Sequence, residues 1–497
     1  MQLAFEQNEQ KIAGGLEDMI TSTSEKGRVA VMCCGHKEYW PQFPGMREEV
    51  INYMNEIAGY VQSSQAELLE SRFVDNIDDS IAYGRDLKAK GCDLLILYVP
   101  AYIASGRYMQ GVIAAECPVV VVGMQKAYKM SGEITIQKVT TDGGPCAIPE
   151  AYSAMVRSGL KPAGLVFGKA CGDPHIINEI HEWCRVANAL HAFKGSRFGY
   201  IGHSYEGMMD MNFDPTAVTK EFGAYVCFPE MCEVVDYIEK CSDEDLAKKM
   251  DEIKETFDIA DASYDRTTKQ VDNSDIEWSA KVAVALDKVV EKHGLSGLVY
   301  YYMGENNSIY ERAASNFIIG NTLMTTKGIS MAGEADMKTC LAMYLTSALG
   351  CGGSFSELVG VDFDADCLIV GHDGPHDIRI SDRKPMIRGL GLMHGKKGYG
   401  CSVEFSIKHG PMTMVAVGSD ANGKFRLIVA EGESQEGWVP EIGNTLTRGY
   451  FGPNIVDFIE NWSKALPPHH QSLSVGHNAS LIEKFGKVMG IEVFRIR

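Results

Sequence analysis

Residues Cys92–Pro100 read CDLLILYVP, an apolar run that follows a glycine and ends at a proline. Such a run is typical of a strand buried on both faces of a parallel sheet. Six similar runs lie in the first three hundred residues: Arg28–Gly35, Pro118–Gln125, Ala163–Lys169, Ser196–Gly202, Gly223–Pro229 and Gly297–Met303. Amphipathic stretches lie between them, including Met46–Val61, Ser80–Lys90, Pro174–Ala192 and Ile276–His293. Strands that alternate with helices predict α/β layers.

The pattern changes after about residue 327. A helix is expected at Asp336–Leu349, and the later apolar runs alternate with polar residues, as half-buried antiparallel strands do. Turn signals such as Asn422-Gly423 separate these runs. The expected strands are Ser354–Gly360, Cys367–His372, Cys401–His409, Thr413–Ser419 and Phe425–Glu431, followed by helices at Pro453–Trp462 and Asn478–Met489 and a strand at Ile491–Ile496.

A chain of 497 residues is long enough for about three domains. We predict an α/β fold in which two doubly wound, Rossmann-like domains occupy residues 1–165 and 166–327. A β-rich C-terminal domain, an antiparallel barrel, is expected at residues 328–497. We expect this third domain to carry most of the metal ligands discussed below.

The composition of the chain limits which kinds of partner it can bind and in which cellular compartment it is expected. Lys and Arg number 47 and Asp and Glu number 66, which gives a formal net charge of -19. This acidity argues against nucleic acid or an anionic membrane as the partner. The 14 cysteines include no CxxC pair, which favours free thiols in a reducing compartment. No signal peptide and no run of 18 apolar residues is visible, so we expect a cytoplasmic protein.

Acidic residues and histidines gather in the last third of the sequence. Glu334 directly precedes an expected helix, and Glu357 lies on a strand that begins after two glycines. Seven of the 13 histidines lie at or beyond His372. Two carboxylates with two imidazoles suit Mn²⁺ or another divalent ion and leave positions for substrate oxygens. The alternative readings are a helix cap for Glu334, a solvent-facing Glu357 and an exposed loop for His469-His470.

Several motifs resemble bacterial L-arabinose isomerases. The segment GEADMKT is similar to that family's GEGDWKT, GGSFSE to GGTSFMED, and CLIVGH to DLVLGSH. The tail from His469 to Val493 resembles the family's ending, which begins with two histidines. Nearer the N-terminus, CGHKEYW stands where the family has GSQHLYG. These stretches are residues 333–339, 352–357, 367–372, 469–493 and 34–40.

The resemblance implies an aldose–ketose isomerase with two α/β domains and a C-terminal barrel, related also to L-fucose isomerases. It implies Mn²⁺, or another divalent cation such as Co²⁺ or Mg²⁺, and a homotrimer or homohexamer with active sites between subunits. Carried across by motif, the metal ligands are Glu334, Glu357, His372 and His470, and the two glutamates are also catalytic. His376 competes with His372, since a gap is needed to align that motif.

The loop after the first strand supplies candidate sugar contacts: His36, Lys37, Tyr39 and Trp40. Trp40 could stack on the sugar, or it could fill a crevice beside Pro41 and Pro44. This loop departs from the family's pattern, and so do the residues after Glu357. The sugar therefore stays open between a pentose, a deoxyhexose and a substituted hexose.

Aldose–ketose isomerisation moves one proton between C1 and C2 and another between O1 and O2. A divalent cation chelated by both oxygens can stabilise the enediolate, while carboxylates move the protons. Glu334 and Glu357 are expected on opposite sides of a cis-enediol, and a hydride shift is the other route. Two further readings are a cytoplasmic sugar-binding protein without catalysis and a related sugar epimerase.

Overall fold

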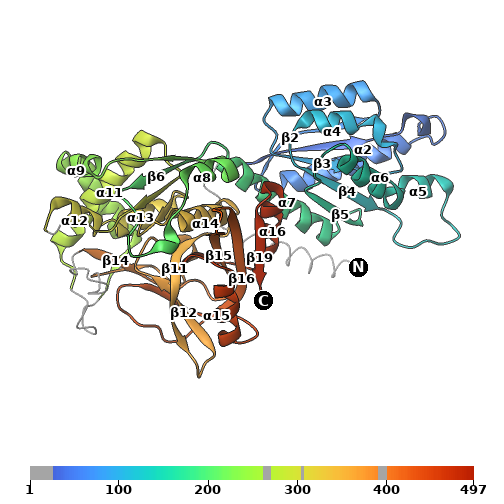
Figure 1. The fold of residues 1–497 in the computed structure, drawn as a ribbon. Coiled ribbons are helices and arrows are strands. Elements are labelled where there is room, and N and C mark those ends of the chain that lie inside the picture. The colour runs from blue at the N-terminus through green and yellow to red at the C-terminus, as the bar shows by residue number, and fades with distance from the viewer. Residues whose placement is uncertain (1–25, 261–269, 304–306, 390–399) are drawn as a thin grey trace. The chain divides into compact units, whose positions relative to one another are not determined.

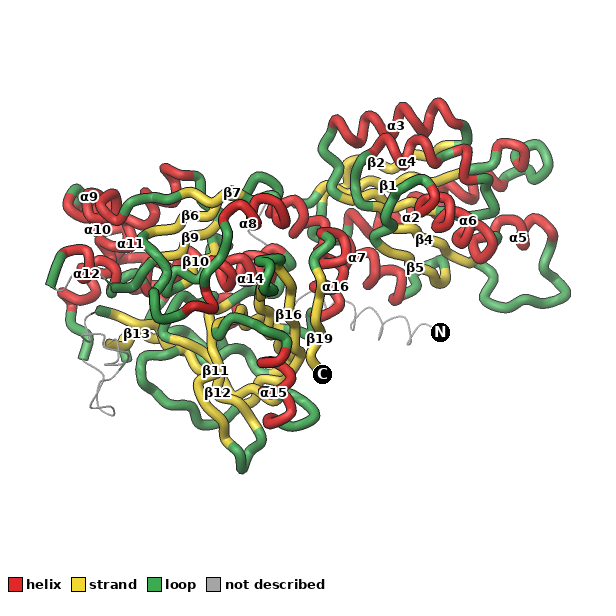
Figure 2. The backbone as a smooth tube through the Cα atoms, viewed as in Figure 1, coloured by secondary structure: helices red, strands yellow, loops and turns green. Residues whose placement is uncertain are grey.

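The computed structural model describes residues 26–260, 270–303, 307–389 and 400–497. The chain divides into two compact units, Met1–Ala192 and Phe193–Arg497, and each is described by itself. Figures 1 and 2 show the first unit as a single sheet with helices and the second as a larger body with more than one sheet.

The first unit is built on a parallel sheet of five strands in the order β2-β1-β3-β4-β5. Helices lie on both of its faces (Figure 1). Its strands are β1 (Arg28–Cys34), β2 (Glu67–Val74), β3 (Leu94–Tyr98), β4 (Val119–Gln125) and β5 (Gly164–Lys169). Its helices are η1 (Lys37–Tyr39), α2 (Met46–Gln62), α3 (Ile77–Ala89), η2 (Ser105–Arg107), α4 (Met109–Ala115), α5 (Ile136–Thr141), α6 (Gly144–Arg157) and α7 (Pro174–Phe193).

The central position of β3 follows from its sequence. All five residues of β3 are buried, because successive side chains point to opposite faces and both faces are covered. Leu95 and Leu97 pack in one cluster with residues of α3, α4 and α6. The strand order reverses at β1, and in open parallel sheets the carboxyl ends at such a point form a crevice that binds ligands.

The second unit contains a parallel sheet of four strands in the order β10-β9-β6-β7. The strands are β6 (Arg197–Ile201), β7 (Tyr225–Cys227), β9 (Gly297–Tyr300) and β10 (Ser330–Ala332). The helices of this part are η3 (Met209–Met211), α8 (Pro215–Phe222), α9 (Met231–Glu239), α10 (Asp243–Thr256), α11 (Asn273–His293), α12 (Ile309–Ala314) and α13 (Ile318–Thr326).

The rest of the second unit is rich in antiparallel strands. Its main sheet has seven strands in the order β15-β18-β11-β12-β17-β16-β19, with a further pairing of β15 with β16. These are β11 (Ser354–Asp362), β12 (Cys367–His372), β15 (Gly410–Ser419), β16 (Phe425–Gln435), β17 (Thr445–Tyr450), β18 (His470–Val475) and β19 (Glu492–Ile496). A small third sheet joins β8 (Asp258–Ile259), β13 (Met386–Gly389) and β14 (Cys401–Glu404). The remaining helices are η4 (Ile378–Ile380), α15 (Ile455–Lys464) and α16 (Ala479–Met489).

Helix α14 (Met337–Ala348) connects the two large sheets of this unit. Every one of its residues is buried, and it contacts β9 and β10 on one side and β15 and β18 on the other. A helix that is buried around its whole circumference belongs in the interior of a domain. The residues just before α14 therefore lie where the parallel and antiparallel sheets meet.

The α/β start and the antiparallel-rich last third agree with the sequence prediction, and the three predicted domains stay a prediction. The predicted boundary after residue 165 falls inside β5, which hydrogen-bonds to β4 as an edge strand of the first sheet. The chain divides after Ala192 instead. The predicted boundary after residue 327 precedes β10, which pairs with β9 in the parallel sheet. Glu334 thus follows a strand of the parallel sheet and not one of the antiparallel sheet.

The cysteines and the apolar character of the helices are the last features of the fold. All 14 cysteines are free thiols. Among the helices of the described segments, none combines the length and the apolar character that a membrane crossing requires.

Candidate metal centre

Glu334 is held in a strained backbone conformation at the carboxyl end of β10. It has φ 57° and Ala335 has φ 58°, in the left-handed region that residues with a side chain rarely adopt. The Ala335 N–H donates to the carbonyl of Tyr300 over 2.8 Å, which fixes this turn. Such strain is typical of functional sites, where the surrounding structure enforces it. The turn leaves Glu334 only 8% exposed.

The register of the antiparallel sheet brings the other candidates together. On β11, Glu357 lies opposite His470 of β18 and opposite Gly371 of β12. His372 directly follows Gly371 at the end of β12. A Cβ atom at position 371 would lie 1.9 Å from the carbonyl oxygen of Thr445, so only glycine fits there. Facing residues on neighbouring strands have Cβ atoms about 5 Å apart, close enough to share a ligand.

Two groups of potential ligand atoms result, and they share His470. Glu357, His372 and His470 form one group, and Glu334, His469 and His470 form the other, each with its ligand atoms within 4.8 Å of one another. All four predicted ligands therefore belong to one cluster. His376 belongs to neither group: its Nε2 lies 3.1 Å from the His372 carbonyl oxygen and its ring packs against Phe405. This arrangement favours His372 over His376.

Each of the three histidines in the cluster has an aspartate beside its Nδ1. The Nδ1 atoms of His372, His469 and His470 lie 2.9, 2.7 and 3.1 Å from carboxylate oxygens. The aspartates are Asp373, Asp210 and Asp336, respectively. A carboxylate on one ring nitrogen orients the imidazole and leaves Nε2 to bind a metal ion, as is common around metal-ligating histidines.

The surroundings of the buried Nε2 atom of His470 show whether a cation fits this cluster. Among the described residues this atom has no hydrogen-bond partner, and the Oε2 atom of Glu334 lies 3.6 Å from it. A buried polar atom without a partner is costly, and a divalent ion between the imidazole and the carboxylate would remove that cost. Carboxylate and imidazole donors suit Mn²⁺ and similar ions.

The pKa shifts of the three histidines in the cluster differ in direction. Burial lowers the pKa of His470, although Asp336 acts against it, so its imidazole is neutral and can accept a metal ion. Burial also acts on His372, but the neighbouring Asp373 carboxylate outweighs it and raises the pKa of His372. Burial opposes protonation of His469 too, yet Asp210 and Glu334 raise its pKa to about 10. The pKa of Asp336 is lowered despite complete burial, because His470 and Thr339 hydrogen-bond to it.

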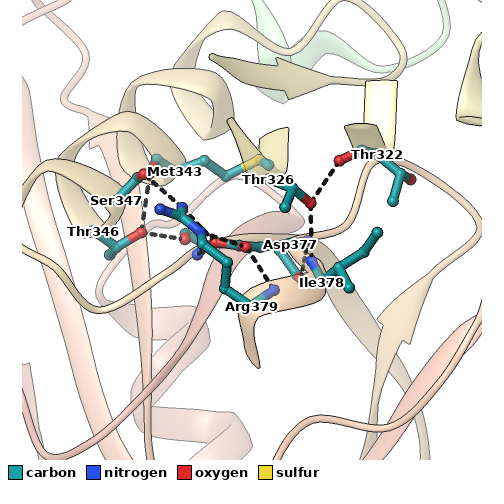
Figure 3. A network of polar contacts seen from close by, with 11 residues as sticks. Thr322, Thr326, Met343, Thr346, Ser347, Asp377, Ile378 and Arg379 are labelled. Atoms are coloured by element: carbon teal, nitrogen blue, oxygen red, sulfur yellow. Dashed lines mark hydrogen bonds and ion pairs between the residues drawn. The ribbon is translucent and has the colours of Figure 1, made fainter. Parts of the chain in front are cut away.

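A buried ion pair fixes the loop that follows His372 (Figure 3). Asp377 receives two hydrogen bonds from Arg379, over 2.8 and 2.7 Å, and one from the Gly353 N–H over 3.1 Å. Arg379 also donates to Ser347 of α14, and the Ile378 N–H donates to Thr326. The network thereby ties the loop to β11, α13 and α14. This holds the start of β11 and the end of β12 in place, where Glu357 and His372 lie.

A small cavity of about 30 Å³ opens beside the cluster. Glu334, His372, Tyr300 and Tyr302 are among its lining residues. Phe355 fills the space behind the two imidazoles, with its ring centroid 4.8 Å from that of His372 and 4.4 Å from that of His470. Glu334 and His372 thus line an opening, and Phe355 forms an apolar wall behind the two imidazoles.

The predicted sugar contacts lie in the first unit, at the carboxyl end of β1. His36 forms a 2.7 Å contact with Glu38, Tyr39 packs against the His36 ring, and Lys37 is exposed. Trp40 donates its indole N–H to Asp75 over 3.0 Å and packs against Phe73. These contacts favour a structural role for Trp40.

Some members of the site escape sequence reasoning. Asp336 and Asp373 follow predicted ligands by one or two positions, so their nearness could have been suspected. His470 begins β18, and His469 directly precedes that strand. Asp210 reaches His469 across 259 positions of sequence, and no local pattern marks it.

The sequence of this chain is similar to those of known isomerases. Residues 352–492 match the family described as L-arabinose isomerase C-terminal domain. A sulfoquinovose isomerase of Alkalicoccus urumqiensis is 22% identical over 81% of this chain and 86% of its own length. L-arabinose isomerases of Herpetosiphon aurantiacus and Geobacillus kaustophilus are 22% and 23% identical, over 65% and 64% of this chain. This chain covers slightly less than two thirds of each of these two relatives, 64% in both cases.

Proposed function

We propose, on the premise that the chain belongs to the superfamily of L-arabinose isomerase, that it is a metal-dependent aldose–ketose isomerase acting on an open-chain sugar. The single observation that carries the proposal is the convergence of Glu334, Glu357, His372 and His470. The relatives named above are sugar isomerases, which supports the reaction class. Their different sugars leave the substrate of this chain open.

The four side chains would hold a divalent cation such as Mn²⁺, and Asp336 and Asp373 would orient the two imidazoles. When bound, this cation supplies Lewis-acid stabilisation of the negative charge that develops on the sugar oxygens. With these four side chains as ligands, the ion would have coordination positions left for oxygens of the sugar.

The two glutamates then have separate tasks. One carboxylate takes the proton from C2 of the aldose and returns it to C1, and the other carries a hydroxyl proton from O2 to O1. Their placement supports this division, since Glu334 comes from the parallel sheet and Glu357 from the antiparallel sheet. Two carboxylates around one ion titrate as a coupled set, so the base is assigned to the pair.

The finer features of the proposal have separate support. The pairing of β15 with β16 joins the ends of a run of six antiparallel strands, which supports a barrel. The order β2-β1-β3-β4-β5 is that of flavodoxin-like doubly wound sheets.

His36, Lys37 and Tyr39 at the end of β1 stay proposed sugar contacts, and Trp40 stays a weaker one. A cytoplasmic homotrimer or homohexamer with active sites between subunits also stays part of the proposal.

A panel of aldoses and ketoses tests the function. The purified chain is incubated with pentoses, deoxyhexoses and substituted hexoses, with Mn²⁺ or with EDTA. We expect Mn²⁺-dependent interconversion of one aldose–ketose pair, and in D₂O deuterium at C1 or C2 of the product. Interconversion without deuterium would assign a hydride shift. Tight binding of a sugar without conversion would instead identify a sugar-binding protein, and inversion at one carbon an epimerase.

A further inference from the structure

We propose that Asp210 is a positioning residue, which sets the ring of His469 beside Glu334 so that His469 binds a sugar hydroxyl and not the metal ion. This inference rests on the proposed function of the site. The 3₁₀ helix η3 that carries Asp210 lies far from the metal ligands in sequence. The motifs that resemble known isomerases do not include it.

Asp210 accepts two hydrogen bonds from His469. Its Oδ2 atom accepts one hydrogen bond from the His469 backbone N–H over 2.9 Å and another from Nδ1 over 2.7 Å. Both bonds end on one carboxylate oxygen, so the main chain and the ring of His469 are fixed together. These charge-assisted bonds are stronger than neutral ones.

Asp210 is itself anchored to the interior of the unit. Its backbone carbonyl accepts a hydrogen bond from the ammonium group of Lys338, which is buried in the first turn of α14. The neighbouring Met211 is fully buried. Helix α14 begins directly after Glu334 and Asp336, so a continuous series of contacts runs from this helix through Asp210 to His469. The ring of His469 is therefore positioned relative to Glu334.

The fixed ring leaves one nitrogen for the substrate. Nε2 of His469 lies 3.9 Å from Oε2 of Glu334, and its ring centroid lies 3.8 Å from that of His470. The His469 side chain is 35% exposed, whereas that of His470 is completely buried. His469 thus lies at the exposed edge of the cluster.

The number of coordination positions decides whether His469 binds the metal ion or the sugar. Under the proposed function, Glu334, Glu357, His372 and His470 would fill four of the six positions that an octahedral ion offers. A sugar that chelates through the oxygens on C1 and C2 needs the two that remain. His469 as a fifth protein ligand would leave only one, so we assign its Nε2 to a hydroxyl of the sugar. A site that hydrogen-bonds a hydroxyl discriminates strongly against sugars in which that group is missing or inverted.

A double-mutant cycle with metal analysis tests the assignment. Asp210→Ala, His469→Gln and the double variant are compared with wild type, and Glu206→Ala, an exposed acid of the same loop, is the control. Bound Mn²⁺ is measured after dialysis, and kcat and KM are measured on the sugar that wild type converts. We expect every variant to retain Mn²⁺. We expect kcat/KM to fall about 10- to 100-fold in Asp210→Ala and in His469→Gln, with no further fall in the double variant.

Three results would overturn the inference. Loss of Mn²⁺ from His469→Gln would make His469 a ligand. Losses that multiply in the double variant would show that Asp210 does not act through His469. An Asp210→Asn variant, whose amide oxygen still accepts from Nδ1, should recover most of the activity, and no recovery would contradict positioning through this bond. Wild type that converts no sugar would defeat the proposed function instead, and the Mn²⁺ content of His469→Gln would still decide its role as a ligand.

Discussion

The imidazole Nδ1 of His470 lies 3.1 Å from Oδ2 of Asp336, and both side chains are completely buried. Asp336 also caps α14 by accepting hydrogen bonds from the backbone and the side chain of Thr339. One carboxylate therefore fixes the direction of the helix and the orientation of the proposed metal ligand. The strained turn at Glu334 brings the second ligand to the same point.

Replacing Asp336 by Asn should weaken metal binding without removing a ligand. The neutral amide holds the His470 ring less firmly and makes it a poorer donor, so we expect the affinity for Mn²⁺ to fall about 10- to 100-fold. Isothermal titration with Mn²⁺ measures the change. Asp364→Asn, at an exposed acid in the turn between β11 and β12, is the matched control and should bind as wild type does. Equal affinity in Asp336→Asn would show that the buried pair is only structural.

The choice between His372 and His376 can be tested directly. His372→Ala should lose bound Mn²⁺, because it removes a ligand atom from the cluster. His376→Ala should keep Mn²⁺, because the Nε2 atom of His376 already faces the His372 carbonyl. Metal content after dialysis distinguishes the two variants. The reverse pattern would assign the ligand to His376.

The ion pair of Asp377 and Arg379 should dominate the stability of the loop after His372. The Asp377 side chain is completely buried, so Asp377→Asn removes the negative charge that faces the guanidinium and should cost about 3–5 kcal/mol of unfolding free energy. Glu460→Gln, which breaks an exposed pair with Lys464 on α15, should cost less than about 1 kcal/mol. Urea unfolding measures both. Similar losses in the two variants would contradict the role given to the buried network.

His376 predicts a dependence of stability on pH. Burial lowers its pKa from 6.5 to about 3. Between these values the unfolded chain binds a proton that the folded chain excludes, so stability falls as the pH drops below about 6.5, by up to about 1.4 kcal/mol per unit. Above this range His376 is neutral in both states and contributes no pH dependence. We expect His376→Gln to lose less stability than wild type between about pH 6.5 and pH 5 in urea unfolding. Parallel curves for the two proteins would refute this.

Local patterns predict much of the fold. The apolar runs at Arg28–Gly35 and Cys92–Pro100 contain β1 and β3. A strand that is buried on both faces is apolar throughout, so its own sequence is enough to identify it. The strand at Glu67–Val74 escaped notice, because it is an edge strand with partly exposed side chains and charged residues. The strand at His470–Val475 escaped as well, since its serines and glutamine are buried only through tertiary packing. Domain boundaries depend on pairing between strands, such as β4 with β5 and β9 with β10, so local patterns alone do not locate them.

The proposed ligands of the candidate site come from short sequence motifs. Glu334, Glu357, His372 and His470 were assigned from short segments, and the structure brings them together. The groups that orient them were harder to predict. Asp336 lies within one of those segments, whereas Asp210 contacts His469 only because the chain folds back over 259 positions. Nothing in a linear pattern could indicate that contact.

Mn²⁺ binding at equilibrium tests the central claim most directly. Wild type, Glu357→Gln and His470→Ala are dialysed against Mn²⁺, and the bound metal is counted per chain. We predict about one ion in wild type and little or none in His470→Ala, because His470 belongs to both groups of ligand atoms. Glu357→Gln should bind more weakly than wild type. One tightly bound ion in all three proteins would contradict the claim that these side chains form a metal centre.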